Sequence, residues 1–301
     1  MNTRQMRALA RPYLVTNGRR FRLKNFDPKG PGESASHEGA KKFLKKSVEA
    51  LSDLQEKLYA QDRWGVLLIF QAMDAAGKDS AIKHVMSGVD PKGCQVYSFK
   101  TPSSEELDHD FMWRTSKSLP ERGRIGIFNR SYYEETLVVR VHPEFLGHQK
   151  LPSPLITKNI WRERFQDINA FERYLSRNGY VIRKFFLNVS RAEQRRRFME
   201  RLERPEKNWK FSIGDLAARD RWRSYMAAYE ETIRATATPH APWVVIPADD
   251  KKFARTVVAA AVIDALNGLK LEFPALDAGE KRDLSRAKRL LLRESRRHIK
   301  S

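Results

Sequence analysis

The chain alternates short apolar runs with amphipathic segments whose apolar residues recur every three or four positions. Such runs, when bounded by turn residues, are typical of buried parallel strands, and the amphipathic segments are typical of surface helices. Strands that alternate with helices predict a parallel sheet covered on both faces. The expected fold class is therefore α/β, a three-layer sandwich around a central five-stranded parallel sheet. The expected strands are residues 66–70, 94–99, 125–128, 180–187 and 243–246.

The expected helices occupy the intervals between these strands. Capping boxes at Ser103 and Ser190 predict the starts of two of them. Gly88 and the Asn-Gly pair at 178–179 predict the ends of two others. The expected helices are residues 37–60, 81–86, 103–118, 129–141, 158–177, a helix from 190, and 250–266, with a further helical pattern from 279.

This pattern divides the chain into three parts. Residues 1–36 are expected to form an irregular N-terminal arm, because residues 25–32 are rich in turn formers. Residues 37–275 are expected to form one α/β domain with a lid at about 190–225, and residues 276–301 a basic tail. The helix 37–60 is expected to use its apolar stripe for packing, within the subunit or against another. That stripe consists of Leu44, Val48, Leu51, Leu54 and Leu58.

The turn after the first long strand resembles a phosphate-binding loop. A strand, a small-residue turn with Gly-Lys and a helix together surround a phosphate with backbone N–H groups. The match to G-x-x-x-x-G-K-[ST] is imperfect, because Ala72 replaces the first glycine and Asp79 replaces the hydroxyl residue. An ordinary strand-to-helix turn is the alternative. The candidate phosphate-binding residues here are Ala75, Ala76, Gly77, Asp79 and Ser80, beside Asp74 and Lys78.

Other polar residues are expected at the same edge of the sheet. In open parallel sheets a ligand binds beyond the carboxyl ends of the strands. That rule brings residues 74–80, Lys100, residues 129–134 and residues 247–250 to one edge.

Phosphoryl transfer needs cations on the moving group and a divalent metal more than covalent chemistry. Lys78 supplies a point charge, and Arg130 suits a bidentate contact with phosphate. A carboxylate among phosphates, such as Asp74, must hold a metal or orient the acceptor, although a turn aspartate bonded to its own backbone is the alternative. Asn129 could ligate Mg²⁺ weakly through its carbonyl. Glu134 could be a ligand or a surface acid.

The segment 195–222 is rich in arginines, and Arg197, Arg201 and Arg204 recur at helical spacing. Arg197 and Arg204 have glutamates four residues before them, but the helical neighbours of Arg201 include no acid. An external anion would relieve the repulsion between these three arginines, and Lys207 and Lys210 extend the basic surface. The position after the fourth strand matches the mobile lid of small-molecule phosphate kinases. A solvated charged face is the alternative.

The net charge of the chain indicates an anionic binding partner. The 57 basic and 37 acidic residues give a net charge of +20. Such an excess favours nucleic acid, anionic lipid or a polyanionic substrate. No apolar run approaches the ~20 residues that a membrane span needs. The N-terminus has no apolar signal segment, and Cys94 is the single cysteine. A cytoplasmic protein is therefore expected.

The combination of motifs resembles the second polyphosphate kinase family. The motifs are Q-A-M-D-A-A-G-K-D at 71–79, S-F-K at 98–100, I-F-N-R-S-Y-Y-E at 127–134 and the lid 195–222 with W-K-F at 209–211. The resemblance covers most of residues 38–267. It implies a P-loop kinase fold with a helical lid, inorganic polyphosphate as phosphoryl donor to a nucleotide, and Mg²⁺ or Mn²⁺ as cofactor. The residues that it carries over are Asp74, Lys78, Lys100, Arg130, Glu134 and Arg201.

Asn129 followed by Glu134 is similar to the branch of that family that phosphorylates nucleoside monophosphates as well as diphosphates. The resemblance therefore implies AMP and ADP as acceptors, with GMP and GDP as further candidates, and in-line transfer without a covalent enzyme intermediate. Many relatives have aspartate in place of Asn129, which puts Asp74 and Asn129 as metal ligands in question. No membrane and no specific nucleic acid is expected as partner, and the stripe on the helix 37–60 favours a dimer or tetramer.

Two other functions remain open on the sequence. One is a nucleoside monophosphate kinase that uses ATP as donor. The other is a nucleic-acid-binding protein whose basic tail and lid contact backbone phosphates, although it lacks an aromatic stacking platform or a groove-reading helix.

Overall fold

A computed structural model describes residues 3–31 and 37–298, with side chains at 4–31 and 43–292. The chain divides into two units, Met1–Leu271 and Glu272–Ser301. The first unit contains the sheet and everything that surrounds it. The second contains the helix α12 (Ala278–His298), whose described side chains are exposed.

The sheet has six strands in the order β1-β6-β5-β2-β4-β3. The five strands expected from the sequence are all present and mutually parallel, which confirms the predicted fold class. The sixth, β1, was not predicted and pairs antiparallel with β6, Leu14 opposite Val244. The strands are β1 (Leu14–Val15), β2 (Gly65–Ala72), β3 (Cys94–Ser98), β4 (Ile125–Asn129), β5 (Tyr180–Asn188) and β6 (Trp243–Pro247).

The central strand β2 determines where the site forms. Residues Val66–Phe70 are fully buried, because helices cover both faces of this strand. The register places Phe70 opposite Asn129 on β4, and Ala72 opposite Leu187 on β5. The carboxyl ends of β2, β4 and β5 therefore lie side by side at one edge.

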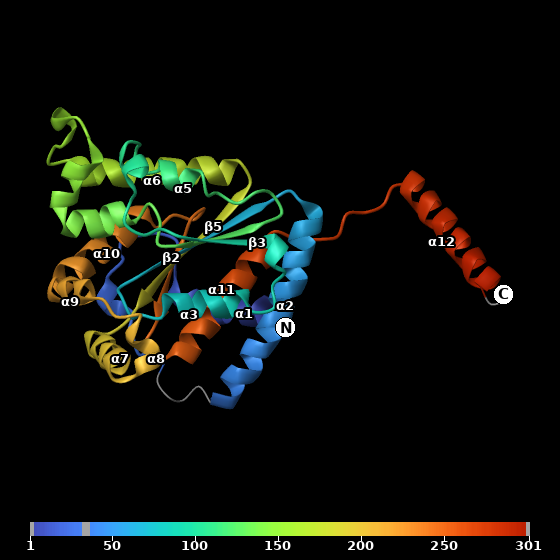
Figure 1. Ribbon diagram of the computed structural model, residues 1–301, viewed down its shortest axis with the longest axis horizontal. Helices are drawn as coiled ribbons and strands as arrows, with labels where there is room; N and C mark the ends of the chain where they lie inside the picture. The colour runs from blue at the N-terminus through green and yellow to red at the C-terminus, as the bar shows by residue number, and fades with distance from the viewer. Residues whose placement is uncertain (1–2, 32–36, 299–301) are drawn as a thin grey trace. The chain divides into compact units, whose positions relative to one another are not determined.

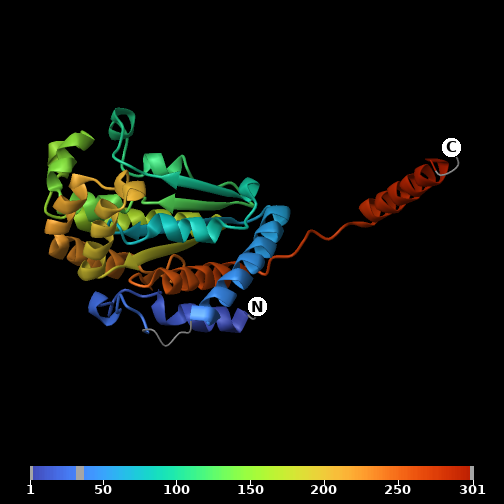
Figure 2. The same ribbon diagram turned by 60° about the horizontal axis from the view of Figure 1, so that its bottom comes forward.

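Helices cover both faces of the sheet (Figure 1). On one face lie α3 (Lys78–Met86) and α11 (Lys251–Asn267), and α1 (Thr3–Ala10) and α2 (His37–Gln61) pack against α11. Figure 2 shows α1 beneath α11 as an outer cover. On the other face lie α6 (Ile160–Arg177) and α10 (Trp222–Thr236), in contact with the π-helix η4 (Glu135–Val139).

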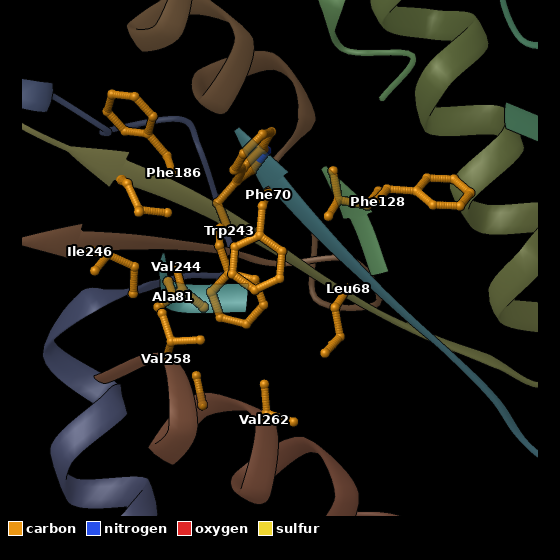
Figure 3. Packing of buried hydrophobic residues seen from close by; sticks show 14 of the residues in the cluster. Leu68, Phe70, Ala81, Phe128, Phe186, Trp243, Val244, Ile246, Val258 and Val262 are labelled. Atoms are coloured by element: carbon orange, nitrogen blue, oxygen red, sulfur yellow. The ribbon is translucent and has the colours of Figure 1, made fainter. Parts of the chain in front are cut away.

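Side chains of α3 and α11 meet those of the sheet in the core (Figure 3). The rings of Phe70 and Phe185 stack with centroids 4.7 Å apart, and Val258 and Val262 of α11 are fully buried. Each such side chain contributes about 1.5–3 kcal/mol on burial. The core therefore lies directly beneath the strand ends and gives the site a rigid base.

Smaller elements complete the first unit. The lid segment folds as α7 (Arg191–Glu203), α8 (Pro205–Asn208) and α9 (Ile213–Asp220). Helix α11 begins after Asp250, whose carboxylate accepts hydrogen bonds from the N–H groups of Lys252 and Phe253. The remaining helices are α4 (Ser104–Leu107), α5 (Trp113–Ser116) and the 3₁₀ turns η1 (Arg11–Tyr13), η2 (Leu23–Asn25), η3 (Pro91–Gly93), η5 (Pro143–Gln149) and η6 (Ser153–Leu155).

Three sequence predictions differ from the structure. Residues 3–15 are regular, because Met6, Ala10 and Val15 are buried against the core. The helix expected at 103–118 is two short helices, since Asp110 accepts a hydrogen bond from the Met112 N–H in place of a helical bond. The helix expected from 129 begins only after Arg130, whose φ of +64° is left-handed.

No helix in the described ranges combines the length and the apolar character that crossing a bilayer requires.

Candidate active site

The loop between β2 and α3 has the backbone of a phosphate cradle. Gly77 has a φ of +101° and precedes the first residue of α3, and Ala75 has a φ of +60°. Left-handed residues between right-handed ones turn successive N–H groups toward one side. The Ala76 N–H bonds the Met73 carbonyl at 3.2 Å, which closes the turn. Because a side chain at φ +101° would strain the backbone, glycine suits position 77.

The loop is held from outside by Arg197 on α7. This guanidinium is 4% exposed and donates to the carbonyls of Ala75 and Ala76, at 3.0 and 2.8 Å. It also donates to the carbonyls of Ala248 and Asp249 and to the Glu193 carboxylate. All five of its donors are thus used. In this conformation Arg197 connects α7 to the loop, and its contact with donor oxygens stays a prediction.

Arg130 links the loop to the end of β4. Its Nη2 lies 3.2 Å from Asp74 Oδ1, and its Nη1 lies 3.6 Å from Glu134 Oε2. Its backbone N–H bonds the Phe70 carbonyl at 3.0 Å. In the amide orientation that satisfies its neighbours, Gln71 donates to Glu134 Oε1 at 2.8 Å. The predicted residues Asp74, Arg130 and Glu134 therefore lie together.

Charge and burial perturb the groups at this edge. Burial, and then the charge of Arg130, lower the pKa of Lys78 below its usual 10.5, against the carboxylates of Asp74, Glu134 and Asp79. Burial raises the pKa of Glu134, although Arg130 and Lys78 oppose the shift. The charge of Glu134 raises the pKa of Arg130 above its usual value. Two cations and two carboxylates thus share one partly desolvated edge, which we call the rim (Asp74, Lys78, Arg130 and Glu134). Perturbed groups in a cleft are typical of functional sites.

Oxygen donors suitable for a hard cation are present beside the rim. Asn129 Nδ2 donates to Asp79 Oδ1 at 2.9 Å. The side-chain oxygen of Asn129, Oδ1, takes no part in this hydrogen bond. Asp74 uses Oδ1 for Arg130. No group of three or more His, Cys, Asp or Glu residues with metal-site geometry occurs within the described part of the chain. The donor set fits Mg²⁺, which binds through one or two carboxylates and completes its shell with water and phosphate oxygens.

Ser80 and Lys100, two further predicted site residues, lie outside the rim. The Ser80 hydroxyl accepts a hydrogen bond from Arg255 of α11 at 2.5 Å, so its role in the structure is to hold α3. Lys100 is exposed, and its carbonyl accepts from Arg114 at 2.8 Å. Lys100 lines a pocket beside the rim.

This pocket has a volume of about 300 Å³, and Arg130 and Glu134 are among its lining residues. The sequence analysis did not predict it, because its walls come from three separate segments, 100–114, 130–139 and 145–149, which no local pattern brings together. Its composition, apolar with a few charged groups, is typical of small-molecule sites. Its walls include Lys100, Pro102, Phe111, Arg114, Val138 and Phe145.

Three comparisons with known proteins bear on this arrangement. The family model described as Polyphosphate kinase 2 matches residues 34–274. The chain belongs to the polyphosphate kinase 2 family.

Two named relatives of this kinase match most of its length. The ADP-polyphosphate phosphotransferase of Rhodopseudomonas palustris is 46% identical, over 96% of this chain and 100% of that protein. The AMP/ADP-polyphosphate phosphotransferase of Meiothermus ruber is 42% identical, over 87% of this chain and 94% of that protein. A crystal structure of polyphosphate kinase 2 from Arthrobacter aurescens TC1 superimposes with a TM-score of 0.83 at 39% identity, covering 92% of this chain and 96% of that one.

In the lid of this kinase, Arg201 has partners that the sequence analysis missed. Its Nη1 lies 3.2 Å from Asp215 Oδ2 and donates to the Lys210 carbonyl at 3.1 Å. Helical spacing could not reveal Asp215, since it lies on α9 rather than on α7. Burial and then Asp74 raise the pKa of Asp215, while Arg201, Arg130 and Lys78 lower it. Arg201 therefore lies in the same electrostatic neighbourhood as the rim, and it does not lack a partner.

The other lid cations are more exposed. The predicted pair of Glu200 with Arg204 is present at 3.5 Å, and Lys207 contacts Glu200 as well. Lys210 lies over the Trp209 ring, whose indole is 78% exposed.

Proposed function

We propose that this kinase transfers a phosphoryl group between inorganic polyphosphate and nucleotides, with AMP and ADP as acceptors and GMP and GDP as further candidates. The observation that carries the proposal is the convergence of Lys78 and Arg130 on one edge, beside a pocket of about 300 Å³. Cations so placed neutralise the charge that develops as a phosphoryl group moves. The names of the relatives from Rhodopseudomonas palustris and Meiothermus ruber support the choice of donor and acceptors.

The acceptor nucleotide fits the pocket. The apolar walls at Phe111, Val138 and Phe145 suit a base and ribose, and Arg130 lines the same pocket. The acceptor phosphate would meet Arg130 and Lys78 there. Asp74 lies 3.2 Å from Arg130 and so is placed to orient the acceptor or hold a cation. Transfer would be in line, from donor oxygen to acceptor oxygen, with no covalent enzyme intermediate.

Polyphosphate would lie between the rim and the lid. The N–H groups of residues 75–77 and the lysine of the loop suit its terminal phosphates. Arg201, Arg204, Lys207 and Lys210 would neutralise the following ones. The net charge of +20 supports a long polyanion as substrate.

Asp74, with the Asn129 carbonyl as a weaker ligand, would hold Mg²⁺ or Mn²⁺. A bound divalent cation supplies charge neutralisation for phosphate oxygens. A cytoplasmic location and a dimer or tetramer stay predictions from the cysteine content and the stripe on α2.

The test uses purified protein with Mg²⁺, polyphosphate and AMP, ADP or GDP in turn, with products separated by chromatography. We expect nucleotides that gain phosphate only when polyphosphate is present. Parallel reactions with ATP as the sole donor test the ATP-dependent alternative. Phosphorylation of AMP by ATP alone, with no response to polyphosphate, would overturn the proposal. RNA retention that is salt-sensitive and survives Lys78→Ala, without nucleotide products, would favour nucleic-acid binding.

A further inference from the structure

A fully buried ion pair lies behind the rim, and the proposed chemistry makes no use of it. Lys184 of β5 and Glu172 of α6 are both 0% exposed, with Nζ and Oε2 2.6 Å apart. Burial lowers the pKa of Lys184 and raises that of Glu172, and each charge opposes the shift of the other. The pair therefore needs further hydrogen bonds to be tolerated inside the protein.

Those hydrogen bonds come from the residues that follow Arg130. Tyr132 and Tyr133 donate to Glu172 Oε1 at 3.0 and 2.8 Å, and both phenols are at most 2% exposed. Lys184 also donates to Tyr133 Oη at 2.9 Å and to the Thr236 carbonyl at 2.8 Å. Each ammonium proton and both carboxylate oxygens thus have a partner. The network joins β5, α6 and α10 to the segment 130–134.

Stability alone does not account for such a network. Removing two charges from water costs several kcal/mol per ion, and apolar replacements of buried pairs are often neutral or stabilising. A buried, fully bonded network instead fixes one arrangement of the groups attached to it. Here the attached groups are Tyr132 and Tyr133, and Arg130 and Glu134 flank them in the chain.

Arg130 needs such a constraint. Its φ of +64° is left-handed, a conformation that strains a non-glycine residue. The segment then enters the π-helix η4 after Glu134, so the helical hydrogen-bond pattern does not fix Arg130. The tyrosines bonded to Glu172 hold the chain two and three residues further on.

We propose that Glu172 and Lys184 are positioning residues, which act through Tyr132 and Tyr133 to hold Arg130 and Glu134 at the rim. The activity part of this inference rests on the proposed function. Because Arg130 acts on the phosphoryl group in transit, its misplacement by about 1 Å costs rate more than substrate affinity.

The first test replaces the pair with apolar side chains of similar size, Glu172→Leu with Lys184→Met, in the full chain. We expect kcat to fall about 10- to 100-fold with KM for nucleotide and polyphosphate nearly unchanged. Ile168→Val is the matched control, because Ile168 is fully buried one turn before Glu172. It should cause a small loss of stability and leave kcat unchanged.

A double-mutant cycle with Arg130→Lys separates positioning from a general structural effect. The triple variant combines Arg130→Lys with Glu172→Leu and Lys184→Met. If the pair acts through Arg130, kcat of the triple variant should lie within about twofold of kcat of Arg130→Lys alone. Multiplied losses would overturn the proposal. Wild-type kcat in Glu172→Leu/Lys184→Met would overturn it as well.

A readout without turnover keeps this test independent of the proposed function. The NMR signal of the Arg130 Nε–H, assigned by its loss in Arg130→Lys, should broaden or shift in Glu172→Leu/Lys184→Met and not in Ile168→Val. An unchanged signal would contradict positioning even if no polyphosphate activity exists. Should the double variant fail to fold, Tyr132→Phe/Tyr133→Phe removes only the two hydroxyls. It should change the same signal, and its failure to do so would overturn the proposal.

Discussion

The rim and the lid both collect cations, but they hold them differently. At the rim, Arg130 lies between two carboxylates, and Lys78 is partly desolvated beside them. In the lid, Arg204 follows the end of α7, is 56% exposed and pairs with Glu200 of that helix. Arg201 pairs with Asp215, which also belongs to the lid. The rim is therefore fixed at the edge of the sheet, whereas the lid cations Arg201, Arg204 and Lys207 pair with carboxylates of the lid itself.

This difference indicates that the rim and the lid contribute to different steps of the reaction. Fixed, partly buried charges can stabilise a transition state because they need no reorganisation during the reaction. Exposed cations that exchange internal partners for an anion contribute mainly to binding. We therefore expect changes at the rim to lower kcat and changes in the lid to raise KM for polyphosphate.

Removal of a rim cation should have the largest effect. Lys78→Ala and Arg130→Ala should each lower ATP formation from polyphosphate and ADP by about 10³-fold or more, the range known for cations on a moving phosphoryl group. Coupled assays measure this, and circular dichroism checks the fold. Lys83→Ala, on the exposed face of the same helix α3, is the control and should keep normal turnover. Wild-type-like turnover in either rim variant would refute the assignment.

Arg197→Lys should affect stability more than any other lid change. A lysine cannot replace the five hydrogen bonds of Arg197, so buried carbonyls of the loop lose donors. We expect the free energy of unfolding to fall by about 2–4 kcal/mol, measured by urea denaturation. Arg196→Lys, at a side chain 60% exposed, should change it by less than about 0.5 kcal/mol. Equal losses in both variants would show that the tie between α7 and the loop is not important.

Arg201→Ala should weaken the binding of the phosphoryl donor, polyphosphate. Loss of one charged contact predicts a KM for polyphosphate about tenfold higher, with KM for ADP unchanged. Arg204→Ala should raise it only a few-fold, since that side chain is more exposed. Initial rates at varied polyphosphate concentration measure both. The reverse order of effects would contradict the division between rim and lid.

The alkaline limb of kcat/KM should move in Glu134→Gln. The Glu134 carboxylate raises the pKa of Lys78, so its removal lowers that pKa, and Lys78 loses its proton at lower pH. The limb should therefore shift to lower pH by a fraction of a unit. Glu203→Gln, at an exposed lid position, is the control. A shift to higher pH would show that Lys78 is not the titrating group.

Local sequence signals predicted the parallel sheet and the main groups at its edge. Strand ends of a parallel sheet must share an edge, so Asp74 and Arg130 could be placed together without a structure. Residues 3–15 were missed because their few apolar side chains form regular structure only against the core, as the burial of Met6 and Val15 shows. Tertiary contacts outweigh local propensity in such segments.

Long-range polar contacts could not be predicted in the same way. Nothing in helical spacing connects Arg201 with Asp215, or Lys184 with the hydroxyl of Tyr133. The role of Arg197 was missed for the same reason, because its acceptors are backbone carbonyls far along the chain. The pocket was missed because its walls come from three segments far apart in the chain, and local periodicity does not show which segments meet.

The central claim is that the rim carries phosphoryl transfer and the lid carries donor binding. Single-turnover ATP formation from saturating polyphosphate and ADP tests it most directly, with Arg130→Lys and Arg201→Lys compared side by side. We predict that Arg130→Lys stays at least about 100-fold slow at saturation, while Arg201→Lys approaches the wild-type rate. A slow Arg201→Lys at saturation, or a normal Arg130→Lys, would contradict the account.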